Sequence, residues 1–197
     1  MGTVKVKVRE EYLLHPTVAF TPERMNLGVL GLKMWQRPEQ PVAQERHRKP
    51  LEETESYRWV EGYQLACEVQ QSCPETLVVS VADREGDIHE WFLEAMPRVP
   101  GERAECIIRA KGHRRLAKGT EPRDLWEEMQ KARAAGRMTV ELTRQPDRPP
   151  RQLTLRVAVK RVTVNGARRP GGRLPPVEVV AVYAKECRPP RAVCTWM

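Results

Sequence analysis

The chain has 197 residues, of which 40% are hydrophobic, enough for one or two domains with a core. Its apolar runs fall well short of the roughly 20 residues of a membrane span, and its charged, valine-rich start is unlike a secretory signal. The five cysteines include no CxxC pair, so neither a zinc site nor a disulfide framework is indicated. We therefore expect a reduced, cytoplasmic protein.

The net charge of +8 is unevenly distributed along the chain. Residues 1–100 carry 12 Lys and Arg against 16 Asp and Glu, whereas residues 101–197 carry 22 against 10. A strongly basic half indicates a polyanionic partner such as a nucleic acid. The alternative is a basic surface that is simply solvated.

The first half predicts a β–β–α–β–α–β succession, with strands at 13–23 and 27–38, a helix at 56–73, a strand at 76–83, a helix at 87–96 and a strand at 104–112. The first two strands should form a hairpin, followed by a polar loop over 39–55. Ser56 is the expected N-cap of the first helix. The β-branched run 76–83 predicts a strand buried on both faces. Helices between strands imply parallel pairing in a layered α/β sheet.

The second half predicts an antiparallel β unit. A helix at 121–136, ending at Gly136, should precede strands at 137–142, 151–165 and 177–187. The connections "TRQPDRPPR" and "GARRPGGRLPP" are basic and rich in Pro and Gly, which is typical of turns. The turns of this unit should therefore present arginines.

Three carboxylates follow the strand at 76–83, and the first of them, Asp83, comes directly after its apolar run. In an open α/β sheet, ligands bind at the carboxyl ends of the strands, and a carboxylate there suits Mg²⁺. The alternative is that Asp83, Glu85 and Asp87 terminate the strand and cap the next helix. A calcium-binding loop is excluded because Ile88 occupies the position that requires glycine.

The segment "VADREGDIHEWF", residues 81–92, resembles the second-acid motif of the DDE transposases of bacterial insertion sequences, in the branch that contains the Tn five transposase. The segment "HPTVAFTPERMNLGVLGLKMWQRP" is similar to the hairpin before that motif, and "CIIRAKGHRRL" to the strand that ends in Arg-x-Lys. The segment "VEVVAVYAKECRPP" is similar to a late strand of the family's inserted β domain. The resemblance covers roughly residues 12 to 190 in the same order.

The resemblance implies an α/β fold with an incomplete ribonuclease-H-like core over residues 1–112 and an antiparallel β insertion domain over 113–197. The implied chemistry is Mg²⁺- or Mn²⁺-dependent cleavage of DNA at transposon ends and strand transfer. Asp83 matches the second catalytic, metal-binding Asp of the family. No aspartate precedes Leu13 and no "YxxRxxxE" motif follows, so we expect an internal fragment, without the dimerisation region, that is inactive alone.

Other matches concern DNA binding. Arg109 and Lys111 match the family's Arg-x-Lys, which contacts DNA phosphates, and Arg114 and Arg115 extend this basic segment. Trp196 is a weaker match to a tryptophan that stacks on an unpaired base.

Two alternatives to an inactive transposase fragment remain open. The first is a non-catalytic, basic DNA-binding module. The second is a self-contained Mg²⁺ nuclease that uses Glu85 and Asp87 in place of the unmatched acids. Four tryptophans and two histidines are expected to serve packing; they are Trp35, Trp59, Trp91, Trp126, His15 and His89.

Overall fold

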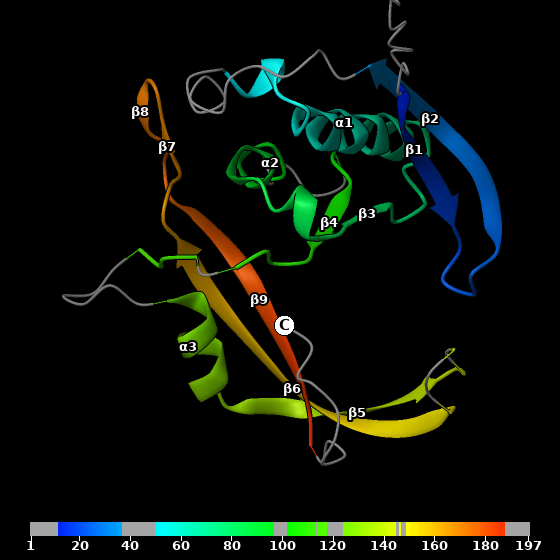
Figure 1. Ribbon diagram of the computed structural model, residues 1–197, viewed down its shortest axis with the longest axis vertical. Helices are drawn as coiled ribbons and strands as arrows, with labels where there is room; N and C mark the ends of the chain where they lie inside the picture. Colours follow the sequence, from blue (N-terminus) through cyan, green and yellow to red (C-terminus); the bar gives the residue numbers. More distant parts are fainter. Residues whose placement is uncertain are drawn as a thin grey trace, which may run out of the picture. The chain divides into compact units, whose positions relative to one another are not determined.

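The computed structural model describes residues 12–36, 50–96, 102–112, 114–117, 124–144, 146 and 149–187. It is a mixed α/β structure, as expected, and its described strands form four small sheets (Figure 1). The chain divides into two compact units. The first unit comprises Met1–Lys111 and Ala167–Arg173, and the second comprises Gly112–Gly166 and Leu174–Met197. No helix among the described residues is long and apolar enough to cross a membrane.

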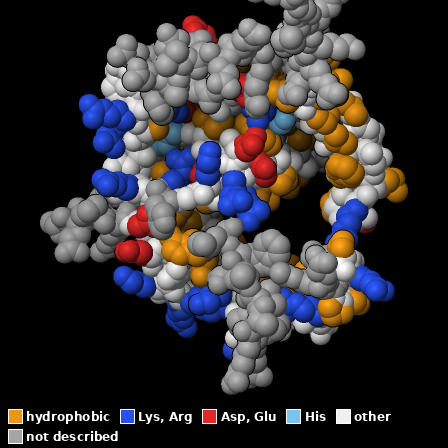
Figure 2. All heavy atoms as spheres, viewed as in Figure 1, with side chains coloured by type: hydrophobic (Ala, Val, Ile, Leu, Met, Phe, Trp, Pro, Cys, Tyr) orange, Lys and Arg blue, Asp and Glu red, His pale blue; other side chains and the backbone are white. Residues whose placement is uncertain are grey.

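The first unit begins with the predicted hairpin. Strands β1 (Tyr12–Phe20) and β2 (Asn26–Gln36) pair antiparallel. The turn is closed by hydrogen bonds between Thr21 and Met25 and from the Arg24 amide to the Thr21 carbonyl, each 2.9 Å long. Large apolar side chains on the hairpin remain exposed and form a continuous band in Figure 2; among them are Leu14, Phe20, Leu27, Val29, Leu32 and Met34.

Helix α1 (Tyr57–Ser72) follows a short 3-10 turn, η1 (Leu51–Glu53), and confirms the predicted first helix. Its buried residues recur at helical spacing: Val60, Tyr63, Ala66, Cys67 and Gln70. Ser56 occupies the N-cap position, as predicted, but its backbone has helical dihedral angles and its side chain makes no capping hydrogen bond.

Strands β3 (Val79–Ala82) and β4 (Glu105–Ile108) pair in parallel, as predicted. Between them lie a second 3-10 turn, η2 (Arg84–Gly86), and helix α2 (His89–Glu94). The prediction that the first of these strands is buried on both faces is wrong: Ala82 is buried, but Val81 is 70% exposed. Buried side chains of α1 and α2 and the buried Ala82 of β3 form one hydrophobic cluster, with Cys106 and Ile108 of β4 packed against it.

The core of the first unit joins these elements. Tyr63 and Trp91 are almost fully buried, with ring centroids 5.6 Å apart, and Trp59 stacks on Trp91 at 6.3 Å. The Tyr63 hydroxyl donates a hydrogen bond of 2.8 Å to the Ala104 carbonyl just before β4. Burial of this phenol is the main reason that the pKa of Tyr63 is raised. The packing therefore connects α1, α2 and β4.

The second unit is the predicted antiparallel β unit, with strand order β5–β6–β9. The strands are β5 (Ala134–Leu142), β6 (Arg151–Val164) and β9 (Val177–Glu186). Helix α3 (Leu125–Lys131) is capped at its N-terminus by Asp124. It packs on the sheet in a buried cluster formed by Met129 of the helix, its C-cap residue Ala132, and Ala158 of β6.

The prediction that Gly136 ends helix α3 is wrong. The helix ends at Lys131, with Ala132 as its C-cap, and Gly136 already lies in β5 opposite Val157 of β6. Pairing with β6 therefore prevails over the local helix propensity of residues 133–136. Within the Pro/Gly-rich turn before β9, strands β7 (Arg168–Arg169) and β8 (Gly172–Arg173) form a small hairpin that belongs to the first unit.

Candidate nucleic-acid interface at the ends of strands β3 and β4

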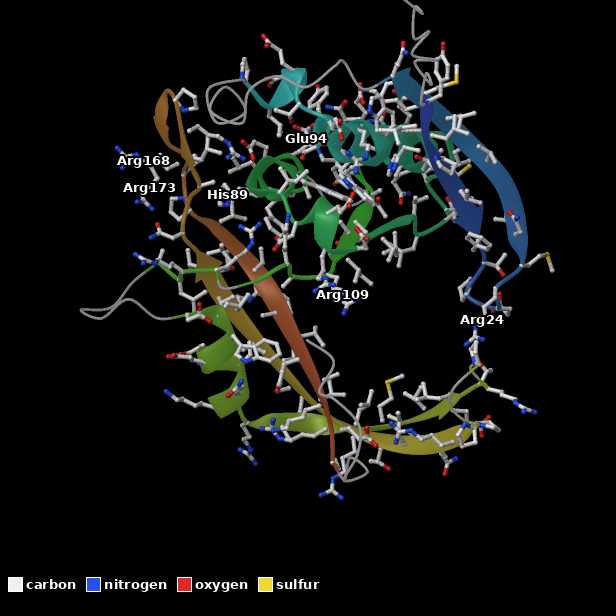
Figure 3. All side chains as sticks on the ribbon, in the orientation of Figure 1. Arg24, His89, Glu94, Arg109, Arg168 and Arg173 are labelled. Atoms are coloured by element: carbon white, nitrogen blue, oxygen red, sulfur yellow. The ribbon has the colours of Figure 1, made fainter. Side chains whose placement is uncertain are left out.

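The carboxyl ends of β3 and β4 meet at one edge of their parallel sheet. Ala82 lies opposite Ile108 in the register, and the Arg109 amide donates a hydrogen bond of 3.0 Å to the Ala82 carbonyl. The residues that follow the two strands, Asp83 and Arg109, therefore leave the sheet side by side, and both are exposed. In Figure 3 the labelled Arg109 lies at the end of β4.

Asp83 has a structural role at this edge. Its Oδ1 accepts a hydrogen bond of 2.8 Å from the amide of Glu85, so it caps the turn η2. This confirms the alternative interpretation of Asp83 as a strand terminator and cap. The cap also holds the carboxylate at a defined and exposed position.

Asp87 connects the two segments that leave the sheet. Its Oδ2 accepts a hydrogen bond of 2.7 Å from the amide of Lys111. Asp87 was wrongly predicted to cap the following helix: the residue at the N-cap of α2 is Ile88, with no side-chain hydrogen bond. The carboxylate instead fixes the backbone of the Arg109–Lys111 segment just beyond the sheet.

Glu85 pairs with a residue that was not among the predicted site residues. Arg58, in the first turn of α1, forms an ion pair with Glu85. Its guanidinium also lies 5.4 Å from the centroid of the Trp35 ring and 5.7 Å from that of Trp59. Cation–π contacts of this kind hold the arginine between the hairpin and α1.

A pocket of about 690 Å³ lies beside this ion pair, and it is lined by Leu13, Leu14, His15, Trp35, Glu55, Ser56, Arg58, Glu85 and Lys111. The ring of His15 meets that of Trp59 edge to face at 4.6 Å. Burial, followed by the nearby Arg58 charge, lowers the pKa of His15 and favours the neutral imidazole. The predicted packing role of His15 is thereby confirmed.

A metal centre does not fit the carboxylates at this edge. In the ranges that the structure describes, no three His, Cys, Asp or Glu side chains converge to hold a cation. Asp83 caps a turn, Glu85 pairs with Arg58, and Asp87 accepts from Lys111. A two-metal site requires several carboxylates directed at one point, and these three side chains are directed at separate partners.

Two of the other predicted site residues lie in the second unit. They are Arg114 and Arg115. The Arg114 carbonyl accepts a hydrogen bond of 2.8 Å from the Leu125 amide, and the backbone of Arg115 forms an isolated antiparallel β-bridge with that of Asp124. Arg115 is exposed and Arg114 is half-buried. Trp196 lies outside the described residues.

The remaining aromatic predictions concern packing. Trp91 is 1% exposed and His89 2% exposed, which confirms both as core residues. Trp126 is 40% exposed but contacts Tyr183 edge to face, with 5.2 Å between ring centroids, so it packs α3 on β9.

Comparison with known proteins assigns no family to this chain. No protein-family model matches it, and no curated protein matches it.

Proposed function

We propose that this chain is a DNA-binding part of a DDE-type transposase, and that by itself it binds DNA without cleaving it. The observation that carries the proposal is the placement of Asp83 beside Arg109, with Lys111 two residues further on. The transposase resemblance requires such an arrangement, in which the second acid and the phosphate-binding Arg-x-Lys occupy neighbouring strand ends. In this proposal the first unit corresponds to part of a ribonuclease-H-like core.

Electrostatics supports DNA as the partner. Arg109 and Lys111 are exposed cations on a backbone fixed by hydrogen bonds to Ala82 and Asp87. A guanidinium forms paired hydrogen bonds with a phosphate, and an ammonium adds a point charge. Holding both on a rigid segment lowers the entropy lost when they bind a phosphodiester.

We expect no DNA cleavage because too few acidic side chains among the described residues are placed to hold the catalytic metal ions. Asp83 is the one acid of the family's triad that the sequence matches, and Glu85 and Asp87 are engaged by Arg58 and Lys111. In the intact family, Mg²⁺ or Mn²⁺ would activate the attacking oxygen and stabilise the leaving one. In this chain the role left to Asp83 is to order the turn beside the phosphate-binding residues.

A non-catalytic DNA-binding module is the second candidate. The observation in its favour is the cap that Asp83 forms, which explains this acid without any metal. The two candidates differ in the partner sequence. A transposase segment should prefer the ends of one mobile element, whereas a general module should bind unrelated duplexes equally well.

The experiment is a salt titration of binding to a fluorescent duplex of about two helical turns, followed by anisotropy. Each neutralised phosphate contributes about 0.9 to the slope of log K against log salt concentration, so Arg109→Glu with Lys111→Glu should reduce the slope by about 2. Lys131→Glu with Arg133→Glu is the matched control, because these two cations have the same spacing and are also exposed. Equal effects of the two double variants would contradict the proposed interface.

A cleavage assay distinguishes the nuclease alternative. With supercoiled plasmid and Mg²⁺ or Mn²⁺, we expect no nicking by the purified chain. Nicking that is abolished by Asp83→Asn would show that other residues complete a metal site. The proposal of an inactive chain would then be wrong.

A further inference from the structure

The small hairpin β7–β8 presents two arginines directly opposite each other. Arg168 pairs with Arg173 in the antiparallel register and Arg169 with Gly172, while Pro170 and Gly171 form the turn. Arg168 and Arg173 are both exposed. In Figure 3 their side chains extend from the hairpin on the side away from His89.

A third arginine of the hairpin, Arg169, forms an ion pair with Glu90 of α2. Arg169 donates from Nε and Nη2 to the two carboxylate oxygens of Glu90, with an Nη2–Oε2 distance of 2.8 Å. Burial of Glu90 alone would raise its pKa, but the hydrogen bonds from Arg169 and the backbone outweigh this and lower it. The pair is therefore ionised at neutral pH and holds the hairpin to the first unit by a bidentate contact.

Backbone constraints also define the shape of the hairpin. Gly172 has φ of +122°, a conformation that side-chain-bearing residues rarely adopt. At the base, a Cβ placed on Gly166 would lie 1.6 Å from the carbonyl oxygen of Leu174. The chain segments on either side of the hairpin therefore run in direct contact.

Arg168 and Arg173 lie opposite each other on one face of the hairpin, where Cβ atoms of opposed residues are about 4.5–5.5 Å apart. At this spacing two exposed guanidiniums can donate to one phosphate or to two adjacent phosphates. The arrangement is thus suited to a polyanion.

We propose that the hairpin β7–β8 is a second DNA-binding element, in which Arg168 and Arg173 contact backbone phosphates and Arg169 is a positioning residue held by Glu90. This inference rests on the proposed DNA-binding function and adds a contact that the transposase resemblance does not include. The absence of aromatic side chains in residues 168–173 favours phosphate contacts over stacking on unpaired bases.

The experiment is the same anisotropy titration with Arg168→Ala combined with Arg173→Ala. We expect the salt slope to fall by about 2, since two phosphate contacts are lost. Lys131→Ala with Arg133→Ala removes the same charge and should change the slope by much less. Because the two hairpin arginines are exposed, the thermal unfolding midpoint should match that of the unmodified chain.

Glu90→Gln tests the positioning role of Arg169. The substitution makes the chain more positive, so long-range electrostatics alone predicts tighter DNA binding. If the ion pair positions the hairpin, binding should weaken instead. Tighter binding by Glu90→Gln would overturn the positioning role.

The outcomes separate this inference from the proposed function. If the unmodified chain binds no DNA, both fail. If it binds, and Arg109→Glu with Lys111→Glu lowers the slope while the hairpin variant matches its control, the hairpin inference alone fails. A lower slope in both variants supports two independent contacts.

Discussion

The side chain of Gln70 forms hydrogen bonds with the segment between α1 and β3, and replacing it with alanine should destabilise the first unit. The side chain is 3% exposed. Its Oε1 accepts a hydrogen bond of 2.8 Å from the Val78 amide, and its Nε2 donates one of 2.8 Å to the Thr76 carbonyl. These contacts fix the residues that enter the strand carrying Asp83.

Gln70→Ala would leave a donor and an acceptor of the backbone without these partners. Each buried polar group left unsatisfied costs about 1–3 kcal/mol. Because water can reach part of this site, we expect a loss of about 2–4 kcal/mol in the free energy of unfolding. For a chain of this length, roughly 2–4 °C accompanies each kcal/mol, so the unfolding midpoint should fall by about 5–15 °C.

The assay is thermal unfolding followed by tryptophan fluorescence, to which Trp59 and Trp91 of the first unit contribute. Gln71→Ala is the control, because this exposed neighbour makes only a 3.5 Å hydrogen bond to Glu102. It should change the free energy of unfolding by less than about 0.5 kcal/mol. Gln70→Glu keeps the acceptor for Val78 and should be intermediate. Equal midpoints for the two alanine variants would refute the proposed role of Gln70.

Three further substitutions or modifications test other parts of the structure. Gly166→Ala should reduce the free energy of unfolding by about 1–3 kcal/mol, because the added Cβ would meet the Leu174 carbonyl. The unfolding midpoint measured by calorimetry should therefore fall, and an unchanged midpoint would contradict this packing. Because the pKa of His15 is lowered in the folded state, its neutral form stabilises the fold above pH 6.5, and this stability is lost as the pH falls through the pKa of the folded state. Urea unfolding at pH values of about 7.5 and 5 should therefore show a smaller loss of unfolding free energy on acidification in His15→Gln than in the unmodified chain. An equal loss in the two proteins would contradict this role of His15. Burial raises the pKa of Cys106 to about 11, so iodoacetamide at mildly alkaline pH should label it far more slowly than the exposed Cys73, as measured by mass spectrometry; equal labelling rates would show that Cys106 is accessible.

Local patterns were sufficient for much of the fold. The hairpin β1–β2 and the sheet β5–β6–β9 were predicted because alternating residues and turn-forming Pro and Gly act over short distances. The double-sided burial of β3 was wrong because an apolar, β-branched run shows strand propensity but not how many elements cover the sheet. Val81 is exposed although Ala82, which follows it, is buried.

The candidate site was predictable only in part. Asp83 was found because it ends an apolar strand, and its cap on Glu85 is a local interaction. The pair between Arg58 and Glu85 joins residues 27 positions apart, and that between Glu90 and Arg169 spans 79. Such pairs leave no periodic pattern in a single sequence, so they emerge only from the folded chain.

The most direct measurement of the proposed interface is hydrogen–deuterium exchange of the unmodified chain with and without duplex DNA, read by peptide mass spectrometry. Binding at the ends of β3 and β4 should slow exchange in residues 83–86 and 109–112, where the backbone is held by the Asp83 cap and by Asp87. Unchanged exchange in both segments, under conditions where the DNA is bound, would show that the interface lies elsewhere.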